Sequence, residues 1–275
     1  MKRLSWFFLF SIVAVSCLDQ PDCYQLNNNY LGVVFKIIGG GTDRVYLSSV
    51  QSPGAGEVLE KPLVTTEIGL PLNPYASETS FLFSGYYAPA DAPGPELLLE
   101  KALNLSYLAR VQFVSEDCGE RHVFTDVAVP STDFDSVRIL NSVPTNPTTT
   151  NLELFRCPRT NLVYVDFLSD VIVKTISVRE LSGTLFTVND TISSILLPLV
   201  QERDTTTFDF VYANEATRTL MVSYRTTTRQ RFEFCGEQTF IDRITNVAGE
   251  TNFATVTVKE DSIYDLPRIN LEITP

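Results

Sequence analysis

Cysteine and histidine are the side chains of this sequence with the widest chemical repertoire. A zinc site or a catalytic triad needs partners for His122, which is the only histidine, and no Cys-x-x-Cys pair occurs. The pattern therefore argues against a metal centre or a redox pair, and an odd number of cysteines indicates that one has a separate role. The five cysteines are Cys17, Cys23, Cys118, Cys157 and Cys235.

Two other groups could support chemistry. Glu120 and Glu237 each follow a Cys-Gly pair, but glycosidases need two carboxylates facing one cleft, and a single recurring Glu is better explained as an acceptor for turn amides. Arg225, Arg229 and Arg231 share one face of an expected strand. They could grip carboxylates or phosphates in forks, pair with the more acidic first copy, or stay solvated. We predict no catalytic, cofactor-binding or metal-binding residue, and no enzymatic activity.

The N-terminus has the features of an export signal. Lys2 and Arg3 precede an apolar run over 5–15 that is too short to cross a bilayer. The tetrapeptide Ala14-Val15-Ser16-Cys17 resembles a bacterial lipobox. The resemblance implies cleavage after Ser16 and lipid on the Cys17 thiol, with residues 17–21 as a lipidated tether. An ordinary signal peptide with a chance cysteine is the alternative.

The charge balance limits the partners. The net charge is −12, and removal of Lys2 and Arg3 with the signal leaves −14. Such a surface repels nucleic acid and anionic lipid head groups. We therefore expect membrane attachment through covalent lipid, in an oxidising compartment that favours disulfides.

The mature chain reads as a tandem duplication. The segment 103–107 matches 220–224, and each is followed by Cys-Gly-Glu at the same distance. A Leu-Pro-Leu segment occurs at 70–72 and 197–199, and Asn-Leu-Glu begins at Asn151 and at Asn270. We predict one copy over 22–155 and a second over 156–275, directly abutting.

Duplication also favours one disulfide pairing. Each copy has one cysteine near its start and one in the Cys-Gly-Glu turn. Of the three possible pairings, the predicted one joins Cys23 to Cys118 and Cys157 to Cys235, each within its own copy.

Alternating apolar residues indicate strands rather than helices. In the first copy the expected strands are 31–38, 44–50, 80–87, 102–114, 121–129 and 151–155, with a hairpin turn at 39–43 between the first two. Six or seven short strands per copy predict an all-β protein of two tandem antiparallel β-sandwich domains, of immunoglobulin or transthyretin type.

One insertion breaks the repeat. The segment 88–95 is rich in Pro, is followed by three leucines and is absent from the second copy. A rigid loop with an apolar tip could bind a partner, whereas the simpler reading is a long hairpin loop whose leucines fold back into the domain. The candidate residues are Pro89, Pro93, Pro95, Leu97, Leu98 and Leu99.

Taken together, these motifs resemble an uncharacterised family of cell-envelope lipoproteins from Bacteroidota. The resemblance covers a lipobox Cys17, an acidic stretch leading to Cys23, an alternating strand, the Leu-Pro-Leu segment and the later Cys-Gly turn at Cys118. It implies an outer-membrane location, facing the periplasm or the cell surface, and supplies no activity.

From these features we expect a non-enzymatic, lipid-anchored structural or interaction module whose partner is another envelope protein, such as an outer-membrane barrel. A fimbrial-type adhesin is one alternative, although only residues 18–22 separate the first two cysteines, which leaves no room for a propeptide. Glycan binding is another alternative, through Tyr86, Tyr87 or Tyr107.

Lipidation gives the first testable prediction. A Cys17→Ala variant loses the only acyl acceptor, so it should move from the membrane to the soluble periplasmic fraction and should no longer be labelled by a palmitate analogue. Membrane association and labelling equal to those of the parent protein would contradict the prediction.

Overall fold

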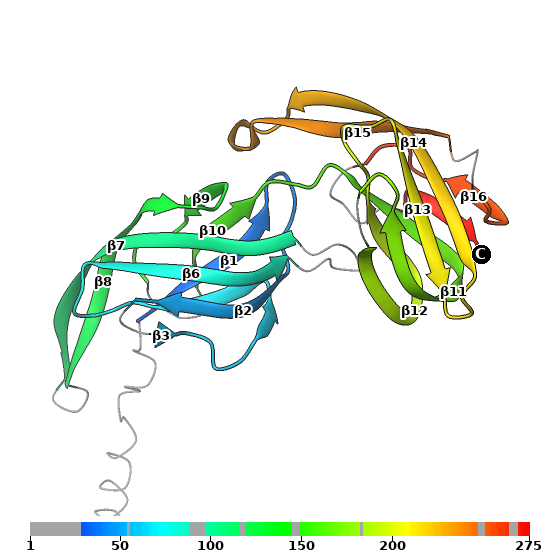
Figure 1. Cartoon of the computed structure of the whole chain (residues 1–275). Coiled ribbons are helices and arrows are strands. Elements are labelled where there is room, and N and C mark those ends of the chain that lie inside the picture. The colour runs from blue at the N-terminus through cyan, green and yellow to red at the C-terminus, as the bar shows by residue number, and fades with distance from the viewer. Residues whose placement is uncertain are drawn as a thin grey trace, which may run out of the picture.

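The computed structural model describes residues 29–53, 56–87, 97–115, 119–144, 149–181, 184–246, 251–263 and 269–275. Within these ranges the chain is all-β, with a single short 3-10 turn and no α-helix. The strands form three sheets, with the strands of residues 30–156 and those of residues 162–258 gathered in two separate groups (Figure 1). They enclose two hydrophobic clusters with no residue in common, one made of residues from Leu31 to Leu154 and the other of residues from Val163 to Ile273.

The first half contains two sheets. One has the order β5-β1-β10-β9, and the other has the order β3-β2-β6-β7-β8 with β4 also paired to β2. Phe35, Phe83 and Phe134 meet edge-on or tilted between them. The strands are β1 (Tyr30–Ile37), β2 (Val45–Ser52), β3 (Gly56–Glu57), β4 (Leu63–Thr65), β5 (Glu67–Pro71), β6 (Glu78–Tyr87), β7 (Leu97–Ser115), β8 (Gly119–Thr132), β9 (Ser136–Ile139) and β10 (Thr150–Arg156).

The second half forms one seven-stranded sheet of order β15-β14-β13-β11-β17-β16, with β12 paired to β11. The long strand β11 shifts register between Asp166 and Val171, so its two parts have different neighbours. The strands are β11 (Leu162–Val178), β12 (Thr184–Pro198), β13 (Thr205–Tyr212), β14 (Thr217–Gln230), β15 (Glu237–Asn246), β16 (Thr255–Val258) and β17 (Leu271–Thr274), and the 3-10 turn is η2 (Glu233–Cys235).

Strand pairing follows the same order in both halves. The start of β11 pairs with β17 in parallel and with the end of β12 in antiparallel fashion, as β1 pairs with β10 and β5. The end of β11 continues through β13, β14 and β15 as β2 continues through β6, β7 and β8. The motifs that recur in the sequence therefore occupy equivalent strands.

The recurring Asn closes each half. Asn151 is fully buried, and its Oδ1 accepts the Gly32 amide at 3.0 Å while its Nδ2 donates to the Asn141 carbonyl at 3.1 Å. Asn270 is also buried and bonds the Tyr164 amide through Oδ1 at 2.9 Å. Each side chain thus ties the last strand of its half to the first and satisfies backbone groups that the ladder leaves unpaired.

The recurring Tyr makes a second matched contact. The Tyr107 hydroxyl donates to the Asn73 carbonyl at 3.0 Å and lies 2.6 Å from the Thr79 hydroxyl. The Tyr224 hydroxyl makes the same pair of contacts to the Val200 carbonyl and the Thr206 hydroxyl, both at 2.6 Å. Burial raises the pKa of Tyr224, and the bond to Thr206 opposes that shift in part. Both rings are buried, so they hold the fold instead of offering a binding platform.

Two expectations about the sheets were wrong. The segment 39–43 does not close a β1–β2 hairpin, because β1 and β2 lie in different sheets. Lys36 of β1 instead forms an isolated antiparallel bridge with Thr42, which precedes β2. The sheets are also not purely antiparallel, since β1–β10 and β11–β17 are parallel pairs. The long chain between the first and last strand of each half makes parallel pairing possible.

The buried Asn gives a stability prediction. An Asn151→Ala variant leaves the Gly32 amide buried without its acceptor, which should lower the free energy of unfolding by about 2–4 kcal/mol in urea denaturation followed by circular dichroism. Asn104→Ala is the control, because the Asn104 amide bonds Ser131 at an exposed position and should cost less than about 1 kcal/mol. Equal losses for the two variants would refute the role given to Asn151.

Candidate functional site

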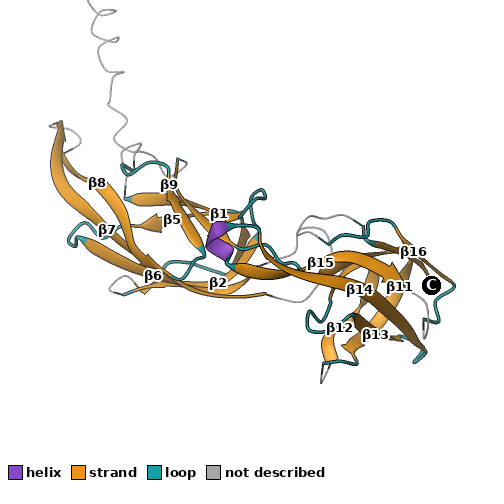
Figure 2. Ribbon diagram, turned by 90° about the horizontal axis from the view of Figure 1, so that it is seen from above, coloured by secondary structure: helices purple, strands orange, loops and turns teal. Residues whose placement is uncertain are grey.

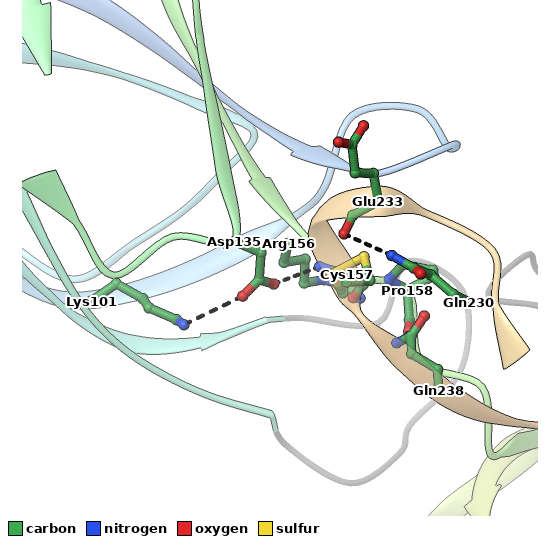
Figure 3. The surroundings of a disulfide bond; sticks show 9 residues. Lys101, Asp135, Arg156, Cys157, Pro158, Gln230, Glu233 and Gln238 are labelled. Carbon is green, nitrogen blue, oxygen red and sulfur yellow. Dashed lines mark hydrogen bonds and ion pairs between the residues drawn. A yellow bond between two sulfur atoms is a disulfide. The ribbon is translucent and has the colours of Figure 1, made fainter. Parts of the chain in front are cut away.

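A disulfide stands where the two halves meet. Cys157 and Cys235 are bonded, as predicted. Cys157 directly follows β10, and its amide donates to the Asp135 carboxylate of the first half at 2.6 Å (Figure 3). The bond therefore attaches the turn between β14 and β15 to the junction and does more than close the second copy. Cys23 and Cys118, like the lipidation candidate Cys17, lie outside the described residues, so their pairing stays a prediction.

Arg156, one residue earlier, anchors the junction to the first half. Its guanidinium is buried and forms a forked ion pair with Asp43, with Nε–Oδ2 at 2.5 Å and Nη2–Oδ1 at 3.2 Å. The guanidinium also lies 5.2 Å from the ring centroid of Tyr87. The backbone carbonyl of Arg156 accepts a hydrogen bond from the Ile38 amide. Burial raises the pKa of Tyr87 well above its usual range. Arg156 was not identified from the sequence, because its partner Asp43 is too distant along the chain to be found by spacing.

A ring from the second half completes the contact. The β14–β15 hairpin extends toward the first half (Figure 2), and the Phe232 ring covers Gly39. A Cβ on Gly39 would lie 2.6 Å from two atoms of that ring, and Gly39 has a φ of +74°, which favours glycine. The Phe232–Gly39 contact and the Cys157–Asp135 hydrogen bond thus cross between the two halves, while the Arg156–Asp43 pair and the disulfide fix the chain on either side of the junction.

The three leucines after the insertion do not all have the same exposure. They begin β7, paired with β6, while Pro89, Pro93 and Pro95 lie outside the described residues. Leu99 is fully buried in the first core, so it cannot provide the partner contact expected of it. Leu98 points the other way and is 64% exposed.

Leu98 is part of an exposed apolar row across one sheet. Tyr46 is directly opposite Val64 on β4 and Tyr86 on β6, and Tyr86 is opposite Leu98. Directly opposed residues share a sheet face, and the two tyrosine rings stack with centroids 4.6 Å apart. We call these four side chains the apolar row: Val64, Tyr46, Tyr86 and Leu98.

Close approach of two strands makes this row possible. A Cβ on Gly85 would lie 1.9 Å from the Tyr46 carbonyl oxygen, so only glycine lets β6 come this near to β2. The sequence contained a signal for Tyr46, because it alternates with the apolar Val45 and Leu47 and must face outward if they are core.

The arginines do not form one cluster. Arg229 pairs with Asp242 at 2.9 Å and lies over the Phe240 ring, while Arg231 lies past the end of β14 with its guanidinium 5.3 Å from the Phe232 centroid. Arg225 is four residues from Arg229 on an extended strand, which separates their Cα atoms by about 13 Å. These positions suit a solvated edge with local pairs better than a single anion site.

The other candidates for chemistry remain isolated. His122 is half-buried, and its ring meets the Tyr75 ring edge-on at 5.6 Å. Glu120 and Glu237 are exposed at their turns. Among the described residues no group of three or more His, Cys, Asp or Glu could hold a metal ion, and no helix is long and apolar enough to cross a membrane.

Comparisons with known proteins add nothing to this geometry: no family model, curated protein sequence or solved structure matches the chain. The lipoprotein resemblance therefore stays an expectation from the residues.

The Phe232–Gly39 contact can be tested with a glycine pair. Gly39→Ala introduces both a clash with the Phe232 ring and left-handed backbone strain, so it should lower the free energy of unfolding by about 1–2 kcal/mol or more, measured by thermal denaturation. Gly41→Ala is the control, since a Cβ there meets nothing within 4 Å.

Combining the substitution with Phe232→Ala separates strain from docking. If the ring contact matters, Gly39→Ala and Phe232→Ala should be clearly non-additive, because the second substitution removes the clash. Strict additivity would show that only backbone strain was measured.

Proposed function

We propose that the chain is a non-enzymatic, lipid-anchored envelope lipoprotein that presents two β-sandwich domains as one structural and interaction module. In this proposal Cys17 carries the lipid, the anchor lies in the outer membrane, and the partner is another protein embedded in the same membrane. The observation that carries the proposal is the apolar row, a partly exposed aromatic and aliphatic surface on the half that follows the predicted anchor in the sequence.

The row has the composition of a contact surface. Val64 and Leu98 are 45% and 64% exposed, and the stacked Tyr46 and Tyr86 rings lie between them. Tyrosine is one of the residues that supply much of the binding energy in protein interfaces. The sheet of the first half that contains β2, β6 and β7 presents this row beside the start of the Pro-rich insertion, which the sequence indicated as a candidate binding segment.

The junction supports a structural role. A ring contact and a backbone-to-carboxylate hydrogen bond cross between the halves, and a disulfide and a buried ion pair fix the chain on either side of the junction. Several independent contacts restrict relative motion more than a flexible linker does. Such a connection suits a protein that holds surfaces in a fixed arrangement above a membrane.

The alternative functions have less support. A glycan platform would need exposed rings, whereas two of the three candidate tyrosines, Tyr87 and Tyr107, are buried. No described feature favours a fimbrial adhesin over a tethered module.

Photocrosslinking in native membranes tests the proposal. A photoreactive amino acid at Leu98 should give a crosslink to an integral membrane protein, because Leu98 is the most exposed member of the row. The same reagent at Leu168, which is 59% exposed in the second half, is the matched control and should give no such product.

A loss-of-contact variant completes the test. Leu98→Thr with Val64→Thr should greatly reduce co-purification of that protein while leaving the thermal midpoint nearly unchanged. The proposal fails if both photoreactive positions give the same products, or if the double variant retains every partner.

A further inference from the structure

The β7–β8 hairpin of the first half extends beyond its own core. Along β7 the core-facing side chains are Leu103, Leu105 and Tyr107, all buried, and the same face continues to Val111 and Phe113. Val111 is 57% exposed and Phe113 is 63% exposed. The apolar face of β7 therefore extends beyond the core that covers its first part.

The neighbouring strand and loop extend this surface. Val111 is directly opposite His122 and Phe113 is opposite Glu120 on β8. The Tyr75 ring, 89% exposed, meets the His122 ring at 5.6 Å. We call Val111, Phe113 and Tyr75 the hairpin face; it combines two apolar side chains with one amphipathic ring.

The second half shows that the fold does not require this face to be apolar. Through the repeat, Val111 and Phe113 are equivalent to Thr228 and Gln230 on β14, and their cross-strand partners correspond as well. At these positions the second half has polar residues, and its hairpin end is bonded to the junction. The apolar residues are thus a property of the first hairpin alone.

The sequence places this hairpin end close to the anchor. Cys118 immediately precedes β8, and its predicted partner Cys23 is separated from Cys17 by five residues, which span at most about 20 Å. A surface carrying Phe, Val and Tyr within that reach of an acyl chain meets the interfacial region of the bilayer, where amphipathic rings and apolar side chains are stabilised.

We propose that the hairpin face inserts into the lipid interface beside the N-terminal anchor, so that the protein lies against the bilayer and does not swing on its tether. The partner is the lipid surface itself. This inference rests on the proposed anchoring, which supplies the nearness to the membrane, and it adds a contact that the anchor alone does not make.

Fluorescence of one introduced Trp tests the contact. The only Trp of the chain, Trp6, lies in the predicted signal segment, so Phe113→Trp in the lipidated protein supplies a single reporter. In phosphatidylcholine vesicles the emission should shift to the blue and should be quenched by brominated acyl chains. Phe234→Trp is the matched control, since Phe234 is 66% exposed in the second half, and it should show neither effect.

Flotation of the same vesicles keeps the two proposals apart. Protein that fails to float would contradict lipid anchoring. Protein that floats while the Phe113→Trp emission stays unshifted and unquenched would overturn the hairpin contact and leave the anchor intact.

A substitution taken from the repeat gives a second measurement. In the Cys17→Ala chain, Val111→Thr with Phe113→Gln should lower partitioning into phosphatidylcholine vesicles about tenfold or more, because most of the apolar contact is removed. These are the residues that the second half uses, so the fold should tolerate them. Unchanged partitioning would overturn the inference. A concentration-dependent dimer that the double substitution abolishes would also overturn it, and would identify a second copy of the chain as the occupant of the hairpin face.

Discussion

Everything in each half depends on bringing its first and last strands together, and a buried amide does this. Asn151 and Asn270 each bond the backbone of the opening strand and the loop that precedes the closing one. A buried amide left unpaired costs more than the bond itself contributes, so the two strands cannot separate locally without a large loss. The following Glu is paired in both halves: Arg138 bonds Glu153, and Lys259 bonds Glu272 at 2.9 Å. The Asn-Leu-Glu motif thus holds the last strand of each half against the first.

The two halves share this closure and differ in sequence at other positions. The Tyr107 and Tyr224 hydroxyls make the same two contacts, which explains why the motif around them survives in both copies. Surfaces have diverged instead: β14 carries arginines and threonines where β7 carries apolar side chains. The β14–β15 hairpin contacts the junction through Cys235 and Phe232, whereas the β7–β8 hairpin is exposed along its outer part.

Much of the fold was predictable from alternation alone. All six strands expected in the first half are present with ends shifted by a few residues, except β7, which begins five residues earlier, and the Cys157–Cys235 pairing is confirmed. The short strands β3, β4, β5 and β9 were missed because two to five residues carry no readable period. The change of sheet after β1 was missed because a glycine-rich turn has the same composition whether or not its strands pair. Neither the Asp43–Arg156 pair nor the apolar row could be found, since both depend on contacts between residues far apart in the sequence.

The parallel pairing of β1 with β10 also determines how the first half bears force. Force applied to the chain before β1 pulls on the start of that strand, and force applied to the second half pulls on the end of β10, where Arg156 leads into Cys157. Because the strands are parallel, these two pulls act along the strand axis in opposite directions, and the ladder is loaded in shear. All of its hydrogen bonds must then yield together, whereas bonds in a ladder pulled open from one end break one at a time. The order of the strands therefore makes the first half mechanically resistant to force applied between the chain before β1 and the second half.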